Sequence, residues 1–524
     1  MNNKKLQTFL PILLSLCMIA GIFIGFKMRD SFPDAHFWGQ SKTNTLQEVL
    51  HLIETKYVDD VNNTHFRDTA IQQLLSVLDP HSAYLPPVEL ESLTDDINGN
   101  FCGVGVEYDI FQDTLFITKV EPEGPAKAAG IHQGDKVLGV NGKHMKFGSL
   151  SSEEIHQAFS GACDSKLQLS ILRNSKPLNI EIKRGLIPVK SVNGGYLTSP
   201  GIGYIKIEKF TSQTHREFME NLTGLQKKGL KKLILDLRGN GGGVLSEAVE
   251  VADEFLDGDK LISYTEGKHS KRKEYRCRRT GQFETGELIV LADEESASAS
   301  EVLMGALQDW DRAKIIGKRS FGKGLVQEIF DLSNQGALKL TVSRYYTPLG
   351  RSIQRSYANG GDAYYQEMAD RMENGDSSKT EIGQPFVTPK GKKLYGGNGI
   401  TPDEIITVAA PKISDSVSRL FNDGIINKFC SDYTTQLTEK DTAGYNGLAF
   451  YHKLTIDNSQ WVQLNELCIK EKIDLNQFNA TDKTYIAKWI KVYMARNIWN
   501  DNAMYEILNE DDAVLKRAVE LLNQ

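Results

Sequence analysis

Three short segments, each rich in small residues and each following an apolar stretch, carry the side chains best suited to chemistry. They are residues 236–243 (DLRGNGGG), 296–301 (SASASE) and 320–327 (SFGKGLVQ). They offer a run of glycines, a serine where a helix is expected to start, and a lysine between two glycines. Such a set suits acyl transfer, in which a base activates a serine and backbone N–H groups bind the developing oxyanion.

The first two segments also have ordinary structural interpretations. Consecutive glycines expose backbone N–H groups to an anion at a helix start, but they also make a flexible strand-to-helix turn. Ser298 with Glu301 three residues later fits a helix capping box, which satisfies free backbone N–H groups. A serine in that place is equally where a nucleophile is presented, with the next N–H as an oxyanion donor. On spacing alone, both interpretations stay open.

Lys323 lies between Gly322 and Gly324, which let the backbone pass close to other segments. Burial lowers a lysine pKa and makes the amine a base, whereas an exposed hairpin lysine would have no such role. None of the ten histidines lies in a motif typical of a Ser-His-Asp triad. We therefore favour a lysine as the base for Ser298, and a Ser-His-Asp protease is the weaker alternative.

The hydrophobic pattern indicates which elements position these side chains. Between residues 186 and 410 strands alternate with helices, and KKLILDL, ELIVLAD and AKIIG are almost continuously apolar. That pattern is typical of strands whose sheet is covered on both faces. Residues 43–97 and 411–524 have apolar residues at helical spacing, and residues 98–185 read as short strands and turns. We predict an α+β protein of several domains, because 524 residues are too many for one core.

Composition and charge limit the classes of partner and cofactor. The net charge of −7 argues against nucleic acid, which binds basic surfaces. The six cysteines show no CxxC or Cys/His spacing, so we expect neither a metal site nor a cofactor. No disulfide framework is apparent in their spacing either.

The N-terminus predicts a membrane anchor within residues 1–30. Residues 9–26 carry no charge, and as a helix they would be roughly 27 Å long, close to the ~30 Å hydrocarbon core of a bilayer. Lys4 and Lys5 precede this stretch, and no A-x-A-like cleavage site follows it. These features predict a single-pass segment in the cell membrane, with the bulk of the chain outside the cytoplasm, in the periplasm.

Together the three segments resemble those of the carboxyl-terminal processing peptidases, also called tail-specific proteases. Ser298 and Lys323 have the 25-residue spacing of that family, and Gln327 follows the lysine by four residues. Further matches in chain order are LDPHSAYL (78–85), RYYTPLGRSIQ (344–354) and GNGITPD (397–403). The resemblance spans about residues 43–410, and residues 356–394 form a polar insert between the last two motifs.

This resemblance implies a role for each matching residue. Ser298 is expected to be the nucleophile, Lys323 the general base, and Gln327 the residue that orients the lysine. The oxyanion hole is expected to form from backbone N–H groups of Ala299 and of the turn that contains Gly242 and Gly243. The resemblance does not decide which of the two glycines donates.

Residues 98–185 independently resemble a PDZ domain through GPAKAAGI (124–131) and GDKVLGVNG (134–142). Gly103, Val104, Gly105 and Val106 stand where such domains have their carboxylate-binding loop, whose N–H groups capture a chain-terminal carboxylate. The partners implied are proteins or peptides with apolar C-termini. Relatives often carry an arginine-glycine pair after the PDZ helix, and this chain has FSGAC there.

The sequence therefore predicts a membrane-tethered serine endopeptidase that cleaves C-terminal regions of extracytoplasmic proteins through an acyl-enzyme. The expected order is an anchor (1–30), a helical region (43–97), a PDZ domain (98–185), a crotonase/ClpP-like β/α spiral core (186–410) and a C-terminal helical domain (411–524). Helical segments on both sides of the PDZ-peptidase unit suggest a homodimer. The alternative is a non-catalytic PDZ scaffold on a peptidase-like core, which would be expected to have lost one of the candidate residues.

Overall fold

The computed structural model describes residues 11, 14–24, 27, 45–376, 383–408, 411–437, 439–442 and 444–524. The chain divides into two compact units, Met1–Ile71 and Gln72–Gln524. In the first unit, α2 (Thr45–Lys56) is joined to the start of α3 (Asn63–Ser76) by an ion pair between Glu54 and Arg67. Much of the predicted anchor lies outside the described residues. Within the described part, no helix combines the length and the hydropathy needed to cross a membrane.

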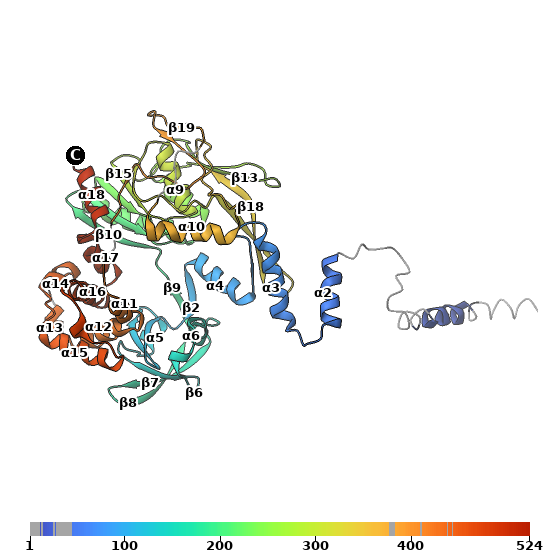
Figure 1. Ribbon diagram of the computed structural model, residues 1–524, viewed down its shortest axis with the longest axis horizontal. Coiled ribbons are helices and arrows are strands. Elements are labelled where there is room, and N and C mark those ends of the chain that lie inside the picture. The colour runs from blue at the N-terminus through green and yellow to red at the C-terminus, as the bar shows by residue number, and fades with distance from the viewer. Residues whose placement is uncertain are drawn as a thin grey trace, which may run out of the picture. The chain divides into compact units, whose positions relative to one another are not determined.

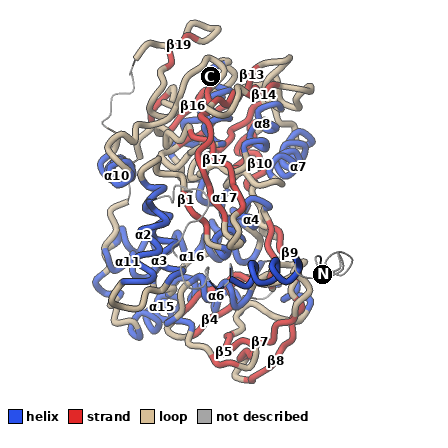
Figure 2. Tube along the Cα trace, turned by 90° about the vertical axis from the view of Figure 1, so that its right-hand side faces the viewer, coloured by secondary structure: helices blue, strands red, loops and turns tan. Residues whose placement is uncertain are grey.

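An antiparallel sheet of six strands with two helices forms the part that resembles a PDZ domain, in the lower half of Figure 2. The strand order is β3-β4-β5-β7-β8 with β6 paired to β5, so β3 is an edge strand. Side chains such as Leu115, Leu167 and Ile155 fill the core between the sheet and α6. The bounds are β2 (Asn100–Gly103), β3 (Val106–Phe111), β4 (Thr114–Val120), α5 (Pro125–Ala128), β5 (Lys136–Val140), β6 (Lys143–His144), η1 (Phe147–Ser149), α6 (Ser152–Phe159), β7 (Lys166–Arg173), β8 (Lys176–Lys183) and β9 (Gly185–Pro188).

A disulfide joins Cys102 of β2 to Cys163, which follows α6. The spacing of the cysteines gave no sign of this pair, because the two lie 61 positions apart and meet only when β2 folds back beside the end of α6. Cys277, Cys430 and Cys468 are buried free thiols.

A second sheet of six strands forms the scaffold of the three candidate segments, with the order β10-β11-β12-β15-β16-β21. The five strands β11, β12, β15, β16 and β21 run parallel to one another, and β10 pairs antiparallel with β11 at one edge. The bounds are β10 (Val192–Ser199), β11 (Ile202–Ile207), β12 (Lys232–Asp236), β15 (Leu288–Ala292), β16 (Lys314–Gly317) and β21 (Glu404–Ile405).

Both faces of this sheet are covered, which explains why its central strands are apolar along their length. One face packs against α7 (Thr214–Lys227), α8 (Leu245–Asp253) and α9 (Ala299–Asp309). The opposite face packs against α18 (Ala513–Leu522) at the end of the chain, where Leu515 lies in one apolar cluster with Ile234 and Ile289 (Figure 1).

A smaller sheet and the polar insert complete this part of the molecule. The smaller sheet has the order β1-β18-β13-β14, with β17 also paired to β18. Its strand β1 belongs to the LDPHSAYL motif. The bounds are β1 (Ala83–Leu85), α4 (Pro87–Asn98), β13 (Leu261–Glu266), β14 (Lys273–Arg276), β17 (Leu325–Asp331) and β18 (Ala337–Tyr346), and in the insert α10 (Gly361–Asn374), β19 (Phe386–Val387) and β20 (Lys393–Leu394).

The C-terminal helices contact both sheets: α12 lies against β3 and β4 of the PDZ-like sheet, and α17 lies against β10 of the core sheet (Figure 1). Phe111 of β3 and Phe116 of β4 belong to the same apolar cluster as Phe429 and Ile490 of these helices. One face of β3 is thereby covered rather than exposed to water. The bounds are α11 (Asp415–Asn422), α12 (Ile425–Gln436), α13 (Glu439–Thr442), α14 (Gly447–Lys453), α15 (Asn458–Lys470), η2 (Leu475–Gln477), α16 (Ala480–Ile498) and α17 (Asp501–Glu510).

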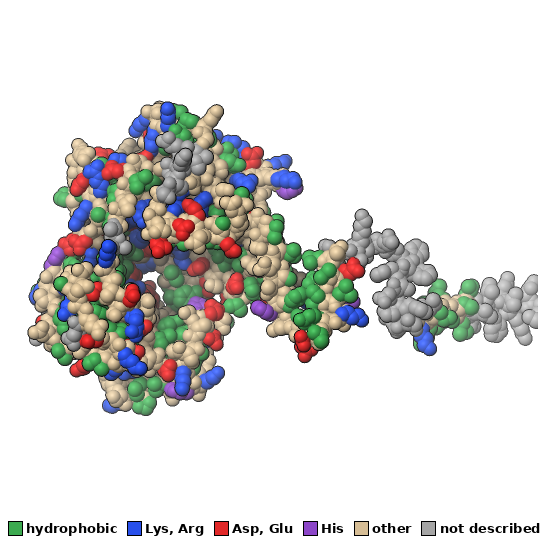
Figure 3. All heavy atoms as spheres, in the orientation of Figure 1, with side chains coloured by type: hydrophobic (Ala, Val, Ile, Leu, Met, Phe, Trp, Pro, Cys, Tyr) green, Lys and Arg blue, Asp and Glu red, His purple; other side chains and the backbone are tan. Residues whose placement is uncertain are grey.

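The mixed α/β organisation with several domains is as predicted. On the face seen in Figure 3, Lys and Arg side chains are interspersed with Asp and Glu, as the balanced charge of the sequence implies.

Candidate active site

The three candidate segments meet at one edge of the core sheet. Residues 236–243 follow β12, residues 296–301 follow β15 and residues 320–327 follow β16, and these three parallel strands are direct neighbours. Because the carboxyl ends of parallel strands lie at the same edge, the turns after them are brought side by side. The fold therefore brings the glycine run, Ser298 and Lys323 into one region.

Ser298 lies at a sharp turn immediately before α9. Its φ of 55° and ψ of −113° place a non-glycine residue in a region that such residues rarely adopt. This strained turn presents the side chain at the helix start, the place where a strand-to-helix turn can present a nucleophile. Ala299 is the first helical residue, and its N–H has no partner within the helix.

Glycine is required at position 242 because that backbone lies against the serine. A Cβ at Gly242 would come within 2.7 Å of Ser298 Cβ and 3.0 Å of Ala299 N, and its φ is +101°. The Gly242 N–H, however, donates to Asn240 Oδ1 at 2.9 Å. The N–H of Gly243 donates to no group in the described part of the chain. Of the two glycines, Gly243 therefore has the free donor, together with Ala299.

The capping box predicted for Ser298 is present. The Ser298 N–H donates to Glu301 Oε2 at 2.8 Å, and the Glu301 N–H faces the Ser298 side chain, although its hydrogen bond goes to the Ser298 carbonyl oxygen at 2.9 Å. The serine therefore starts the helix, and a serine in that place can cap a helix and still face a substrate.

Glu301 is fully buried and joins the serine segment to the lysine segment. Its Oε2 also accepts the Lys323 N–H at 2.9 Å, and its Oε1 accepts from the Gly322 N–H and the Ser320 hydroxyl. Burial raises the pKa of this carboxyl, and the four donors counteract part of that rise. Because the amides of Ser298 and Lys323 bind one oxygen atom, the two segments are held directly against each other. The Tyr345 hydroxyl contacts the carbonyl oxygens of the same two residues.

Lys323 has the environment of a base. Burial, with a smaller contribution from the positive charge of Lys339, lowers the pKa of Lys323 to about 8, against the opposing charges of Glu301 and Asp79. Within the described residues, its ammonium group makes no hydrogen bond. A Cβ at Gly322 would lie 3.0 Å from Arg355 Cβ, which is the close approach that the flanking glycines permit.

Gln327 lies on β17, and its side chain amide donates to Thr341 Oγ1 at 3.1 Å. The structure therefore gives Gln327 a partner on β18, and no contact that orients Lys323 is seen in the described part.

Two side chains near the lysine could not be assigned a role from the sequence. His81 of the LDPHSAYL motif contacts the Phe321 ring and lies 3.3 Å from the Tyr364 hydroxyl of α10. Burial first, and then the charge of Lys323, lower the pKa of His81 to about 4, so this imidazole is neutral at pH 7. The motif match signalled His81 without a role, and nothing in the polar insert signalled Tyr364.

The loop predicted to bind carboxylates lies between β2 and β3. The N–H groups of Val104 and Gly105 donate to no group in the described residues, whereas the Val104 carbonyl accepts from Ala126. Gly105 has a φ of +76°. Adjacent free N–H groups beside an edge strand are what capture of a chain-terminal carboxylate requires.

Comparison with known proteins identifies two modules in this chain. Residues 201–360 match the model of peptidase family S41, and residues 92–172 match that of the PDZ domain. A carboxy-terminal-processing protease of Bartonella bacilliformis is 35% identical over 313 residues, which is 59% of this chain and 71% of that protein. A probable CtpA-like serine protease of Staphylococcus aureus is 33% identical over 316 residues, 60% of this chain and 63% of that protein.

Among solved structures, a photosystem II D1 C-terminal processing protease is 29% identical. The match covers 59% of this chain and 83% of that one, with a TM-score of 0.35.

Proposed function

This chain belongs to peptidase family S41, together with the carboxy-terminal-processing serine proteases, and from that premise we propose an endopeptidase that uses Ser298 and Lys323 to cut proteins near their C-termini. The observation that carries the proposal is the convergence at Glu301. One buried carboxylate oxygen binds the backbone amides of both residues. A serine and a lysine that served only as helix cap and surface residue would not need this shared anchor.

The reaction begins when neutral Lys323 accepts the hydroxyl proton of Ser298 and the Ser298 oxygen attacks the carbonyl carbon of the scissile bond. The resulting oxyanion accepts hydrogen bonds from the N–H groups of Ala299 and Gly243. Protonated Lys323 then returns its proton to the departing amine, and the acyl group stays on the serine. Neutral Lys323 then deprotonates a water molecule, which adds to the acyl carbon. The bond from that carbon to the Ser298 oxygen breaks, the oxygen takes the proton back from Lys323, and the new C-terminus leaves.

Lys323 can act as the base only when its amine is neutral, and its lowered pKa makes that possible. A pKa of about 8 leaves an appreciable neutral fraction near pH 7, whereas an ordinary lysine would be almost wholly protonated. His81 lies near the lysine but is neutral and packed between aromatic rings, so it serves as part of the wall of the site.

Substrates are selected by their C-terminal tails. The free N–H groups of Val104 and Gly105 bind the terminal carboxylate, and the tail adds as a strand beside β3. Apolar side chains of the tail pack against β3 and α6, where the Tyr108 and Phe159 rings stack on each other. The chain is tethered by residues 1–30 to the cell membrane, acts outside the cytoplasm and associates as a homodimer. The spiral architecture of the crotonase/ClpP group is part of the same proposal.

The test measures the rate at which the purified full-length chain, in detergent, cleaves a protein substrate that has an apolar tail. The same rate is measured for two variants. Ser298→Ala and Lys323→Ala should each lower the cleavage rate by about 10⁴-fold or more. Ser333→Ala, which changes an exposed serine, is the matched control and should cut at the wild-type rate. Near-normal cleavage by either active-site variant would refute the proposed pair. Tail binding by the wild-type chain without any cleavage would instead support the scaffold alternative.

A further inference from the structure

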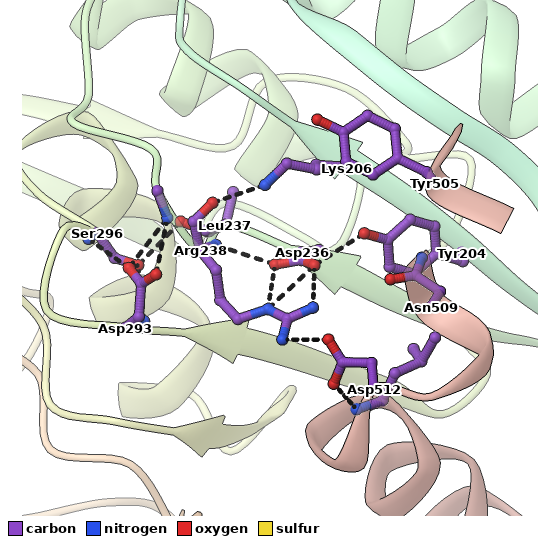
Figure 4. A network of polar contacts seen from close by, with 12 residues as sticks. Tyr204, Lys206, Asp236, Leu237, Arg238, Asp293, Ser296, Tyr505, Asn509 and Asp512 are labelled. Atoms are coloured by element: carbon purple, nitrogen blue, oxygen red, sulfur yellow. Dashed lines mark hydrogen bonds and ion pairs between the residues drawn. The ribbon is translucent and has the colours of Figure 1, made fainter. Parts of the chain in front are cut away.

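The glycine turn is anchored at its start by the C-terminal helices, far outside the peptidase motifs. Arg238, at the beginning of the turn, binds both carboxylate oxygens of Asp236, with Nη2 at 2.6 Å from Oδ2 and Nε at 3.0 Å from Oδ1. Its remaining nitrogen, Nη1, donates to Asp512 Oδ2 at 2.7 Å (Figure 4). The guanidinium group is therefore held between one carboxylate of the core and one of the C-terminal domain.

Asp512 is itself held in a fixed direction. It is the N-cap of α18, and its second oxygen, Oδ1, accepts the Leu515 N–H at 2.8 Å. The helix that it caps is packed against the core sheet through Leu515. The Asp512 side chain is 20% exposed and that of Arg238 21% exposed, so their ion pair is only partly screened by water.

Further contacts fix the neighbouring helix α17 on the same sheet. Asn509 donates to the Tyr196 hydroxyl at 2.6 Å, and the Tyr505 hydroxyl donates to Glu208. The Tyr505 ring also lies beneath the ammonium group of Lys206. These contacts hold the segment that leads to Asp512 in one place, so its carboxylate meets Arg238 in one geometry.

Arg238 and the residue after it fix the start of the glycine turn. The Arg238 carbonyl oxygen accepts from Lys206 Nζ at 2.7 Å, and the Gly239 N–H donates to both oxygens of Asp293 at 3.0 Å. The far end of the turn is held by the core, because the Phe210 N–H donates to the Gly242 carbonyl oxygen and the Val244 N–H donates to the Phe210 carbonyl oxygen, both at 2.8 Å. The glycines between these two ends are conformationally permissive, so the direction of the Gly243 N–H depends on the anchors at both ends of the turn.

We propose that Asp512 is a positioning residue for the oxyanion hole, which acts through Arg238 to fix the turn that carries the Gly243 N–H. The inference rests on the proposed function, because it concerns the donors that bind the oxyanion of that reaction. It assigns to the C-terminal helical domain a part in catalysis that acts through the glycine turn of the core. Loss of the anchor should misdirect the Gly243 donor without removing it.

The experiment uses the full-length protein in detergent and the variant Asp512→Asn. Asparagine has one acceptor oxygen in place of two, so it can cap α18 or bind Arg238, but not both. The matched control is Asp511→Asn, which makes the same change on the preceding residue, whose side chain is 61% exposed and pairs at the surface with Lys488. Asp512→Ser is a second variant, because serine also caps a helix but is too short to reach Arg238.

Two quantities are measured: kcat and KM for the tailed substrate, and the inhibition constant of a peptide aldehyde. The Ser298 oxygen adds to the aldehyde carbon, and the oxygen of the adduct occupies the place of the oxyanion. Loss of a whole oxyanion donor costs about 10²–10³-fold in kcat, so misdirection should cost less, about tenfold. We expect both Asp512 variants to lose about tenfold in kcat and in aldehyde affinity, with KM changed less than about twofold. Asp511→Asn should match the wild type.

Equal kcat and aldehyde affinity in the Asp512 and Asp511 variants would overturn the inference. So would a loss of kcat in the Asp512 variants with unchanged aldehyde affinity, which would indicate a merely structural role. If Ser298→Ala cleaved the substrate at the wild-type rate, the proposed function itself would be overturned. That outcome is seen before any Asp512 variant is compared, so the two failures are distinguishable.

Discussion

At the level of single residues, the proposed rate depends on how strongly the surroundings of Lys323 disfavour its charged form. Lys339 of β18 contributes to the lowered pKa, because two nearby positive charges repel. Replacing Lys339 by methionine removes that repulsion, so the pKa of Lys323 should rise above about 8. The rate at pH 7 should then fall about threefold, because less of the base is neutral, while the rate well above the pKa stays the same. A pH profile of kcat measures this shift.

The control for this prediction is Lys339→Arg, which keeps the positive charge and a side chain of similar reach. Its pH profile should coincide with that of the wild type. A profile of Lys339→Met that moved to lower pH, or did not move, would show that Lys339 does not act on the base through its charge.

At the level of elements, the insert helix α10 packs against the lysine turn from outside. Tyr364 is 3% exposed and lies against the rings of Phe321 and His81, while Arg371 donates to the carbonyl oxygens of Arg319 and Ser320. Because burial is the largest cause of the lowered Lys323 pKa, a cavity opened here should admit water and raise that pKa. Tyr364→Ala should therefore move the acidic limb of the kcat profile to higher pH. It should also cost about 3–5 kcal/mol of unfolding free energy, measured in urea.

Met372→Ala on the same helix is the comparison, since that side chain is 46% exposed and its loss opens no cavity. A lower stability of Tyr364→Ala with an unmoved pH profile would mean that α10 supports the fold and does not tune the base.

The sequence predicts the elements around the site better than it predicts the contacts within it. The continuous apolar runs at β12, β15 and β16 predict buried strands, because only a sheet covered on both faces tolerates them. The ordered match of the three turns to a peptidase family then predicts that Ser298 and Lys323 share one site. The choice of Gly243 over Gly242 as oxyanion donor depends on the Asn240 side chain, which binds the Gly242 N–H. The role of Asp512 depends on its contact with Arg238, which lies 274 positions away in the sequence. Neither has a periodic pattern from which a sequence could predict it.

At the level of the whole molecule, the C-terminal helices hold the PDZ-like sheet as well as the glycine turn. Arg496 of α16 binds Glu107 of β3 at 2.8 Å and Asp501 of α17 at 2.6 Å. Arg496→Met should free β3 and β4, so their amide hydrogens should exchange roughly fivefold faster, whereas those of β7 and β8 should not change. Hydrogen exchange followed by mass spectrometry resolves these strands. The control is Arg419→Met, which changes an arginine whose side chain is 53% exposed and pairs with Asp423. If Arg496→Met did not make β3 and β4 exchange faster than β7 and β8, the PDZ-like sheet would be stabilised by its own core alone. Faster exchange confined to β3 and β4 would show that the strand proposed to receive the substrate tail is supported by the same domain that anchors the oxyanion turn.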